Sequence, residues 1–172
     1  SRYGITVEAD IVFPRFFYDY DYFDRKYTRV SLFGMHSVNT SSANSLSGVD
    51  TTWVDDDYAN FQVYAIKSTN ASRNAYFKLS CSNSPYPLPE LTSSIFVNVY
   101  DNSQWNLSVR VEPAISKYGP FVSSSAAYDY NVIFEGYNVN AGLSENKFSV
   151  TGTIDHVTGS RFLTEAKRLY LG

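Results

Sequence analysis

The clearest structural pattern in the sequence is the segment Ser103-Gln-Trp-Asn-Leu-Ser-Val-Arg-Val111. Apolar side chains stand at every second position from Trp105 to Val111, and Asn106, Ser108 and Arg110 lie between them. Successive side chains of a strand point to opposite faces, so this alternation predicts a half-buried β-strand with Trp105 in the core. The pattern recurs along the chain without a catalytic motif between the repeats. The sequence therefore predicts an architecture more strongly than an activity.

Period-two alternation or β-rich composition marks further segments of the chain. We expect strands at Ile5–Phe13, Arg29–Met35, Asn60–Lys67, Asn74–Ser80, Ile95–Val99, Gln104–Glu112, Tyr128–Tyr137, Lys147–Ile154 and Lys167–Leu171. One helical turn is expected within Gly159–Ala166. No window keeps the apolar i, i+3, i+4, i+7 spacing of a long helix, so the chain is predicted to be all-β, with two packed antiparallel sheets.

Length and composition limit the classes of protein that fit. The 172 residues suit one domain with a large core, and 15 Tyr and 12 Phe favour strands over helices. The net charge of −3 supplies no basic field, so nucleic acid and membrane surfaces are not expected partners. Cys81 is the single cysteine, which excludes an intrachain disulfide and predicts an inert, buried thiol.

The apolar members of the central strands predict one shared core. Its expected members are Trp105, Leu107, Val109, Phe61, Val63, Phe77, Leu79, Val132 and Phe134. Trp105 is the largest of them, so we expect its removal to be among the most damaging substitutions in the chain.

In this order the segments resemble the laminin G-like, concanavalin A-like jelly-roll family. The matching pieces are Ile5-Thr-Val-Glu-Ala-Asp10, Val30-Ser-Leu-Phe-Gly34, Phe61-Gln-Val-Tyr64, Tyr76-Phe-Lys-Leu79, Tyr100-Asp-Asn-Ser-Gln-Trp105, Val132-Ile-Phe134 with Gly136, and Leu169-Tyr-Leu-Gly172. The resemblance implies a two-sheet antiparallel jelly-roll sandwich over residues 1–172. The family normally continues beyond the late Leu-x-x-Gly strand, so we expect the chain to be an excerpt of a longer polypeptide. A partner segment should then cover the last strand, or the isolated chain should aggregate.

Domains of this kind occur in phage-like structural and surface proteins. The resemblance therefore implies a noncatalytic structural or surface-display module of a larger assembly, with a virion component as one such assembly. Neighbouring domains or subunits would be its partners, and the extracellular surface or the virion its location.

A carbohydrate-binding, lectin-like module is the alternative function. Trp53 and Tyr58 could stack on a sugar ring, with Asp55 and Asp57 as neighbouring hydrogen-bond acceptors. The competing interpretation of Trp53 is that it anchors its long loop to the sandwich.

Calcium is the one cofactor that the acidic loops could hold, and the resemblance implies a calcium ion at the rim of such domains. The candidate ligands are Asp50, Asp55, Asp56 and Asp57, and Asp19, Asp21 and Asp24 form a second cluster. Neither cluster has the spacing of a dedicated calcium loop, so solvated loop acids are the alternative interpretation.

No catalytic residue is predicted, and a polysaccharide-cleaving enzyme is the least favoured class. Jelly-roll glucanases display Glu-x-Asp-x-x-Glu, but here Glu8-Ala-Asp10 is followed by Phe13 at the second Glu position. Glu8 and Asp10 are expected to be outward polar residues of a strand. His36 and His156 have no predicted nucleophile beside them. Three Asn-x-Ser/Thr triplets, at Asn39, Asn70 and Asn106, leave glycosylation undetermined.

Overall fold

The structure is a computed structural model that describes residues 4–15, 28–37, 59–69, 71–81, 84, 86–114, 129–140, 143–164 and 167–172. Its strands are β1 (Ile5–Phe13), β2 (Arg29–Ser37), β3 (Ala59–Lys67), β4 (Ala75–Ser80), β5 (Leu91–Thr92), β6 (Ser103–Pro113), β7 (Tyr130–Asn140), β8 (Leu143–Ile154) and β9 (Lys167–Leu171). One helix of this part of the chain, α2, spans His156–Thr164.

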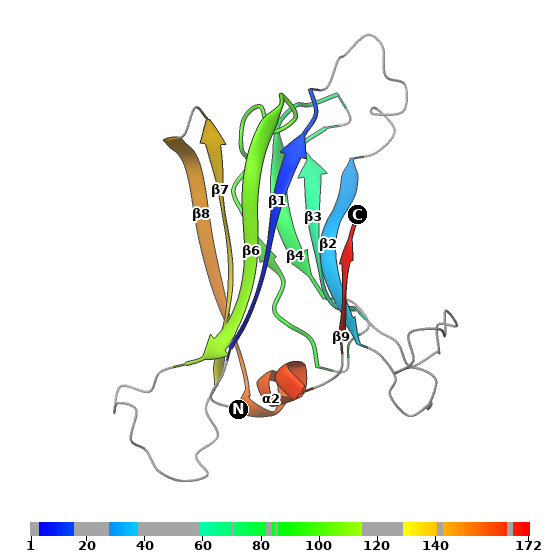
Figure 1. Cartoon of the computed structure of the whole chain (residues 1–172), viewed down its shortest axis with the longest axis vertical. Helices are drawn as coiled ribbons and strands as arrows, with labels where there is room; N and C mark the ends of the chain where they lie inside the picture. Colours follow the sequence, from blue (N-terminus) through cyan, green and yellow to red (C-terminus); the bar gives the residue numbers. More distant parts are fainter. Residues whose placement is uncertain are drawn as a thin grey trace, which may run out of the picture.

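The strands form two antiparallel sheets that pack face to face (Figure 1). Sheet A has the order β1-β6-β7-β8, and sheet B has the order β5-β4-β3-β2-β9. Each sheet is a meander of consecutive strands extended by one strand from elsewhere in the chain, namely β1 in sheet A and β9 in sheet B. In Figure 1, β1 and β6 lie in front of β3 and β4, and α2 lies at the lower end of the sandwich.

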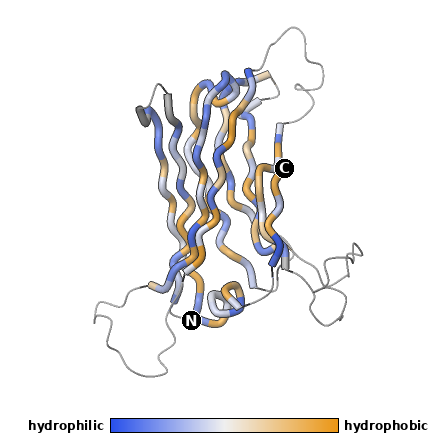
Figure 2. Tube along the Cα trace, in the orientation of Figure 1, coloured by the Kyte–Doolittle hydropathy of each residue, from blue (hydrophilic) through white to orange (hydrophobic). Residues whose placement is uncertain are grey.

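The prediction of an all-β, two-sheet antiparallel sandwich is confirmed. Hydrophobic and hydrophilic residues alternate along its strands, as Figure 2 shows. One expected strand was misplaced: the short strand of this region is Leu91–Thr92, whereas Ile95–Val99 contributes one isolated bridge, between Phe96 and Ala75. Asn98 has a φ of 57°, a left-handed conformation that starts a turn and ends the extended segment.

All the predicted core residues belong to one buried cluster that the two sheets share. Trp105 is 1% exposed, and its ring centroid lies 4.8 Å from that of Phe77 on the opposite sheet. Phe77 also contacts Phe148 and Phe13, with centroid distances of 5.8 and 5.9 Å. These rings join β4 of sheet B to β1, β6 and β8 of sheet A, so they fix how the two sheets face each other.

Helix α2 begins at His156, earlier than the turn expected from Gly159 onward. The early start follows from Asp155, whose Oδ1 accepts a hydrogen bond of 2.8 Å from the backbone N of Thr158. This bond lowers the pKa of the Asp155 carboxyl. Phe162 of the helix is buried and packs on Phe61 of β3, with ring centroids 6.4 Å apart, so α2 closes one end of the core.

Gly159 allows the close approach of α2 to the ring of Tyr130 on β7. A Cβ atom at position 159 would lie 2.1 Å from Tyr130 Cδ2, far inside van der Waals contact. Gly159→Ala is therefore expected to lower the free energy of unfolding by about 1–3 kcal/mol, as overpacking does. In an exposed helix the same change would stabilise the protein by about 1 kcal/mol. Urea denaturation measures the sign, with Val157→Ala on the exposed side of α2 as the control; stabilisation by Gly159→Ala would show that the helix does not pack on Tyr130.

Candidate functional site

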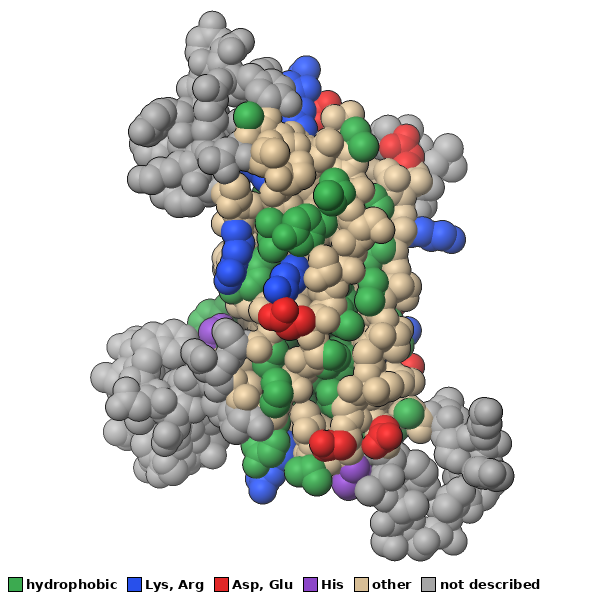
Figure 3. Space-filling model, turned by 180° about the vertical axis from the view of Figure 1, so that it is seen from behind, with side chains coloured by type: hydrophobic (Ala, Val, Ile, Leu, Met, Phe, Trp, Pro, Cys, Tyr) green, Lys and Arg blue, Asp and Glu red, His purple; other side chains and the backbone are tan. Residues whose placement is uncertain are grey.

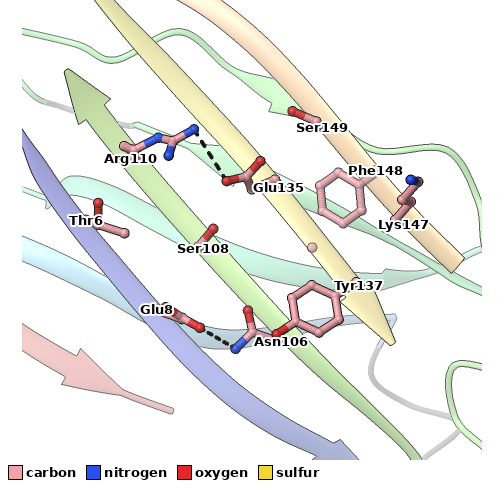
Figure 4. Close-up of a pocket in the computed structure, with 11 residues that line it drawn as sticks. Thr6, Glu8, Asn106, Ser108, Arg110, Glu135, Tyr137, Lys147, Phe148 and Ser149 are labelled. Carbon is pink, nitrogen blue, oxygen red and sulfur yellow. Dashed lines mark hydrogen bonds and ion pairs between the residues drawn. The ribbon is translucent and has the colours of Figure 1, made fainter. Parts of the chain in front are cut away.

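The loop residues proposed from the sequence for carbohydrate and calcium lie outside the described residues. These are Trp53, Asp55, Asp57 and Tyr58 for carbohydrate, and Asp50, Asp55, Asp56 and Asp57 for calcium. The second acidic cluster, Asp19, Asp21 and Asp24, lies outside them too. The described residues instead form a hollow on the outer face of sheet A, with a volume of about 760 Å³ (Figure 4).

The hollow is built from the outward-facing residues of all four strands of sheet A. Pairing of the strands places Glu8, Ser108, Glu135 and Ser149 in one row across the sheet. The next row is Asp10, Asn106, Tyr137 and Lys147. Glu8 and Glu135 both flank Ser108, so their Cα atoms are two strand spacings apart, about 9.5 Å. The site is therefore a shallow, mixed-charge surface with Ser108 and Asn106 at its base.

Asn106 organises the side of the hollow that faces β1. Its Nδ2 donates hydrogen bonds of 2.7 Å to Glu8 Oε1 and 3.1 Å to Asp10 Oδ1. The side chain is buried although it stands on the polar face of β6, because the two carboxylates cover it. Both protons of the amide are directed to acceptors, so Asn106 holds Glu8 and Asp10 in fixed positions. Glu8 and Asp10 themselves are exposed on the outward face of β1, as the sequence predicted.

Arg110 organises the opposite side. Its Nη2 lies 3.7 Å from Glu135 Oε1, and its Nε lies 3.4 Å from Glu112 Oε2. The guanidinium thus lies between Glu112 of β6 and Glu135 of β7 and pairs with both carboxylates. Figure 4 shows the two bridges, Asn106 with Glu8 and Arg110 with Glu135, on either side of Ser108.

The floor and rim of the hollow add apolar surface. Gly136 on β7 has no side chain, and a Cβ there would meet Leu107 and Phe148, at 2.5 and 2.8 Å. Phe148, which stands on the core-facing side of β8, therefore lies against the Gly136 backbone, and it lines the hollow together with Gly136. Tyr137 stands beside this floor on the outward face of β7, where it is 41% exposed.

This arrangement can bind a flat, hydroxyl-rich ligand. Carboxylates at fixed positions accept hydrogen bonds from hydroxyl groups, Lys147 and Ser149 can donate to ring and hydroxyl oxygens, and Tyr137 offers a ring face. Part of the signal was present in the sequence, because Asn106, Ser108 and Arg110 were expected to share one face of a strand. The register that sets Glu8, Glu135 and Tyr137 beside them could not be derived from single strands.

Among the described residues, His36, His156 and Cys81 lie on separate parts of the fold. His36 lies on β2 with its ring 4.9 Å from that of Tyr170, and His156 begins α2. Cys81 Sγ donates to Asn60 O at 2.8 Å, and burial raises the pKa of its thiol, which fits the expected inert cysteine. Of the three triplets, Asn39 and Asn70 are outside the described residues, and the Asn106 amide is engaged by Glu8 and Asp10.

Within the described ranges, no three His, Cys, Asp or Glu side chains gather in a way that could hold a metal ion. The helix of the described chain is too short and too polar to span a membrane.

Any function proposed for this chain rests on its fold and on the hollow, because known proteins offer no match. No family model, no curated protein and no solved structure matches the chain. The laminin G-like resemblance therefore stays a prediction.

Proposed function

We propose that this chain is a noncatalytic binding module that holds a carbohydrate in the hollow of sheet A. The observation that carries the proposal is the row of polar side chains from Glu8 to Ser149 beside an exposed tyrosine ring. Sugars are bound by such combinations, because the ring faces are apolar and the edges carry hydroxyl groups. Glu8, held by a hydrogen bond from Asn106, and Glu135, paired with Arg110, act as the acceptors.

Tyr137→Ala tests this proposal. A glycan array at neutral pH identifies the oligosaccharide that binds, and titration calorimetry measures its affinity for each variant. We expect Tyr137→Ala to weaken binding about tenfold, the equivalent of ~1.4 kcal/mol, because the stacking surface is lost. Tyr137→Phe should keep most of the affinity.

Two controls make the outcome specific. Tyr76→Ala changes a half-buried tyrosine of β4, on sheet B, and should leave glycan binding unchanged. The array is repeated with a chelator, because the acidic loop around Trp53 is the competing site. If glycan binding required calcium and were unchanged by Tyr137→Ala, the binding site would be the loop around Trp53, and the proposal of a site in the hollow would be wrong.

Turnover is measured on the same oligosaccharide. Glu8 and Glu135 stand on either side of Ser108, and glycosidases cleave with a pair of carboxyl groups. Cleavage of the bound oligosaccharide that is lost in Glu135→Gln would overturn the noncatalytic part of the proposal.

A second candidate function is a structural module of a larger assembly, and the outer face of sheet B favours it. Tyr64 and Tyr76 of β3 and β4 lie half-buried there, and the Arg29 guanidinium lies 3.8 Å from the Tyr64 ring centroid. Tyrosine and arginine are enriched in protein interfaces. Figure 3 shows hydrophobic side chains in several patches between polar ones on the side of the molecule away from the view of Figure 1.

Tyrosine footprinting of the native assembly tests this second candidate. Tyr64 and Tyr76 should become less reactive toward iodination in the assembly than in the free chain. Equal reactivity in both states would rule out this face as the interface.

A further inference from the structure

Sheet B extends past sheet A at the side where β9 lies. Val30, Leu169 and Leu171 pair with Ala65, Met35 and Phe33, all of which are buried residues of the core-facing side. Yet Val30, Leu169 and Leu171 are 38%, 53% and 77% exposed. These three residues, called here the apolar shelf, face inward but have no opposing strand among the described residues.

The neighbouring edge of sheet A is open as well. Among the described strands, β1 pairs with β6 alone. Every second residue of β1 directs its backbone N–H and C=O groups to the other edge, where no described strand pairs with them. Its inward residues Ile5, Val7, Ala9 and Ile11 are only half-buried, whereas their neighbours on β6 are buried. In Figure 1 the free side of β1 is the side on which β2 and β9 lie.

We propose that the free edge of β1 accepts an extended strand from a partner protein. Such a strand would become the fifth strand of sheet A and would lie over the apolar shelf, so its inward side chains would be apolar. A strand added to the free edge of β9 would extend sheet B further and leave Leu169 and Leu171 uncovered. The apolar shelf therefore selects β1 as the acceptor.

The charge of β1 indicates which outward-facing side chains the partner strand carries. Glu8 and Asp10 stand on the outward face of β1, and no basic side chain of the described residues forms an ion pair with them. Residues directly opposite in an antiparallel pair interact, and opposite charges stabilise the pairing. The partner strand accordingly alternates apolar residues with Lys or Arg.

The shape of this edge disfavours a second copy of the chain as the occupant. Pairing of β1 with β1 of another copy about a twofold axis would bring the two projecting β9 strands into the same space. A helix would not satisfy the backbone groups of β1 either. One inserted strand fits both the backbone edge and the apolar shelf.

The test uses a fluorescent peptide of alternating Lys and Val and the 172-residue chain. We expect fluorescence anisotropy to show binding, and expect Leu171→Lys to weaken it at least about tenfold by placing a charge on the apolar shelf. Leu171 is 77% exposed, so the variant should fold normally. Val157→Lys, at a 60% exposed position of α2, is the matched control and should bind like the unchanged chain.

Peptide chemistry separates strand pairing from nonspecific attraction. N-methylation of the amides that face β1 should abolish binding, whereas N-methylation on the outer edge should not. A peptide of alternating Glu and Val should bind at least about tenfold more weakly, and the double variant E8Q/D10N should reduce that difference. Equal binding of both N-methylated peptides would overturn the proposal.

Hydrogen exchange and sedimentation test the other occupants. Slow hydrogen exchange of the β1 amides that point to the free edge, measured in the free, monomeric chain, would show that the chain covers this edge itself. A dimer broken by Leu171→Lys would show that a second copy does so. Either result would overturn the proposal.

Strand binding at the edge of β1 is a function separate from carbohydrate binding in the hollow of sheet A. The two sites share Glu8 and Asp10 of β1, whereas Tyr137 belongs to the hollow and Leu171 to the apolar shelf. Tyr137→Ala should therefore leave peptide binding intact, and Leu171→Lys should leave glycan binding intact.

Discussion

Trp105→Ala is expected to lower the free energy of unfolding by about 3–5 kcal/mol, the usual cost of removing a large buried aromatic side chain. Trp105 is 1% exposed, and its ring lies 4.8 Å from Phe77 and 4.9 Å from Phe96 between centroids. Its Nε1 donates to Ser103 Oγ at 3.1 Å, so the indole has both its apolar and its polar partners. Alanine would leave a cavity at the junction of the two sheets.

Urea denaturation measures the loss, with two comparisons. Trp105→Phe should cost less than alanine because most of the volume is kept. Tyr137→Ala, on the outer face of the neighbouring strand, should cost less than about 1 kcal/mol. A loss below about 1 kcal/mol for Trp105→Ala would mean that β6 is not the central strand of the sandwich.

The two-sheet sandwich could be predicted from the sequence because most strands carry their own alternation. Trp105, Leu107 and Val109 alternate with polar residues, and the burial of these three apolar side chains follows directly from the pleat, although Asn106 and Ser108 between them are buried too. The short strand Leu91–Thr92 could not be predicted, because two residues are too few to show an alternation of apolar and polar side chains. The helix start was missed because it depends on one capping bond, from Thr158 to Asp155.

The hollow could not be predicted in the same way because it depends on register between distant strands. Glu8 and Ser108 are opposite each other although they are far apart in the chain, and Glu135 joins them from a third strand. A shift of one residue in either pairing would have moved these side chains to the other face. The alternation showed that polar residues face outward, but it did not show which of them share a row.

The burial of Asn106 illustrates the same limit. Alternation placed it on the polar face of β6 and predicted exposure there, yet Glu8 and Asp10 cover it. An amide is the side chain that fits, because its two N–H groups can donate to two carboxylates at once. Replacing the amide by a carboxyl group removes both of these donors.

Asn106→Asp should lower the free energy of unfolding by about 2–3 kcal/mol at neutral pH. The change keeps the shape but replaces the NH₂ group, which donates to Glu8 and Asp10, by an oxygen that can only accept. Three carboxylates would then meet at a buried position. The expected cost lies below that of a fully buried unpaired charge, about 3–5 kcal/mol, because Glu8 and Asp10 are exposed to water.

The pH dependence of this loss identifies its cause. Like charges and burial should raise the pKa of the introduced carboxyl in the folded state above its unfolded value, near 3.9. Below that unfolded value the group is protonated in both states, and the loss of stability is absent. The loss grows as the pH rises from the unfolded pKa to the folded pKa, and it is complete above the folded pKa. Denaturation of Asn106→Asp should therefore approach that of the unchanged chain in acid. Adding E8Q/D10N to Asn106→Asp should recover most of the stability at neutral pH, because amides can donate to the new carboxylate. If the loss in free energy of unfolding changed neither with pH nor on adding E8Q/D10N, Asn106 would matter for packing and not as the donor between the two acids.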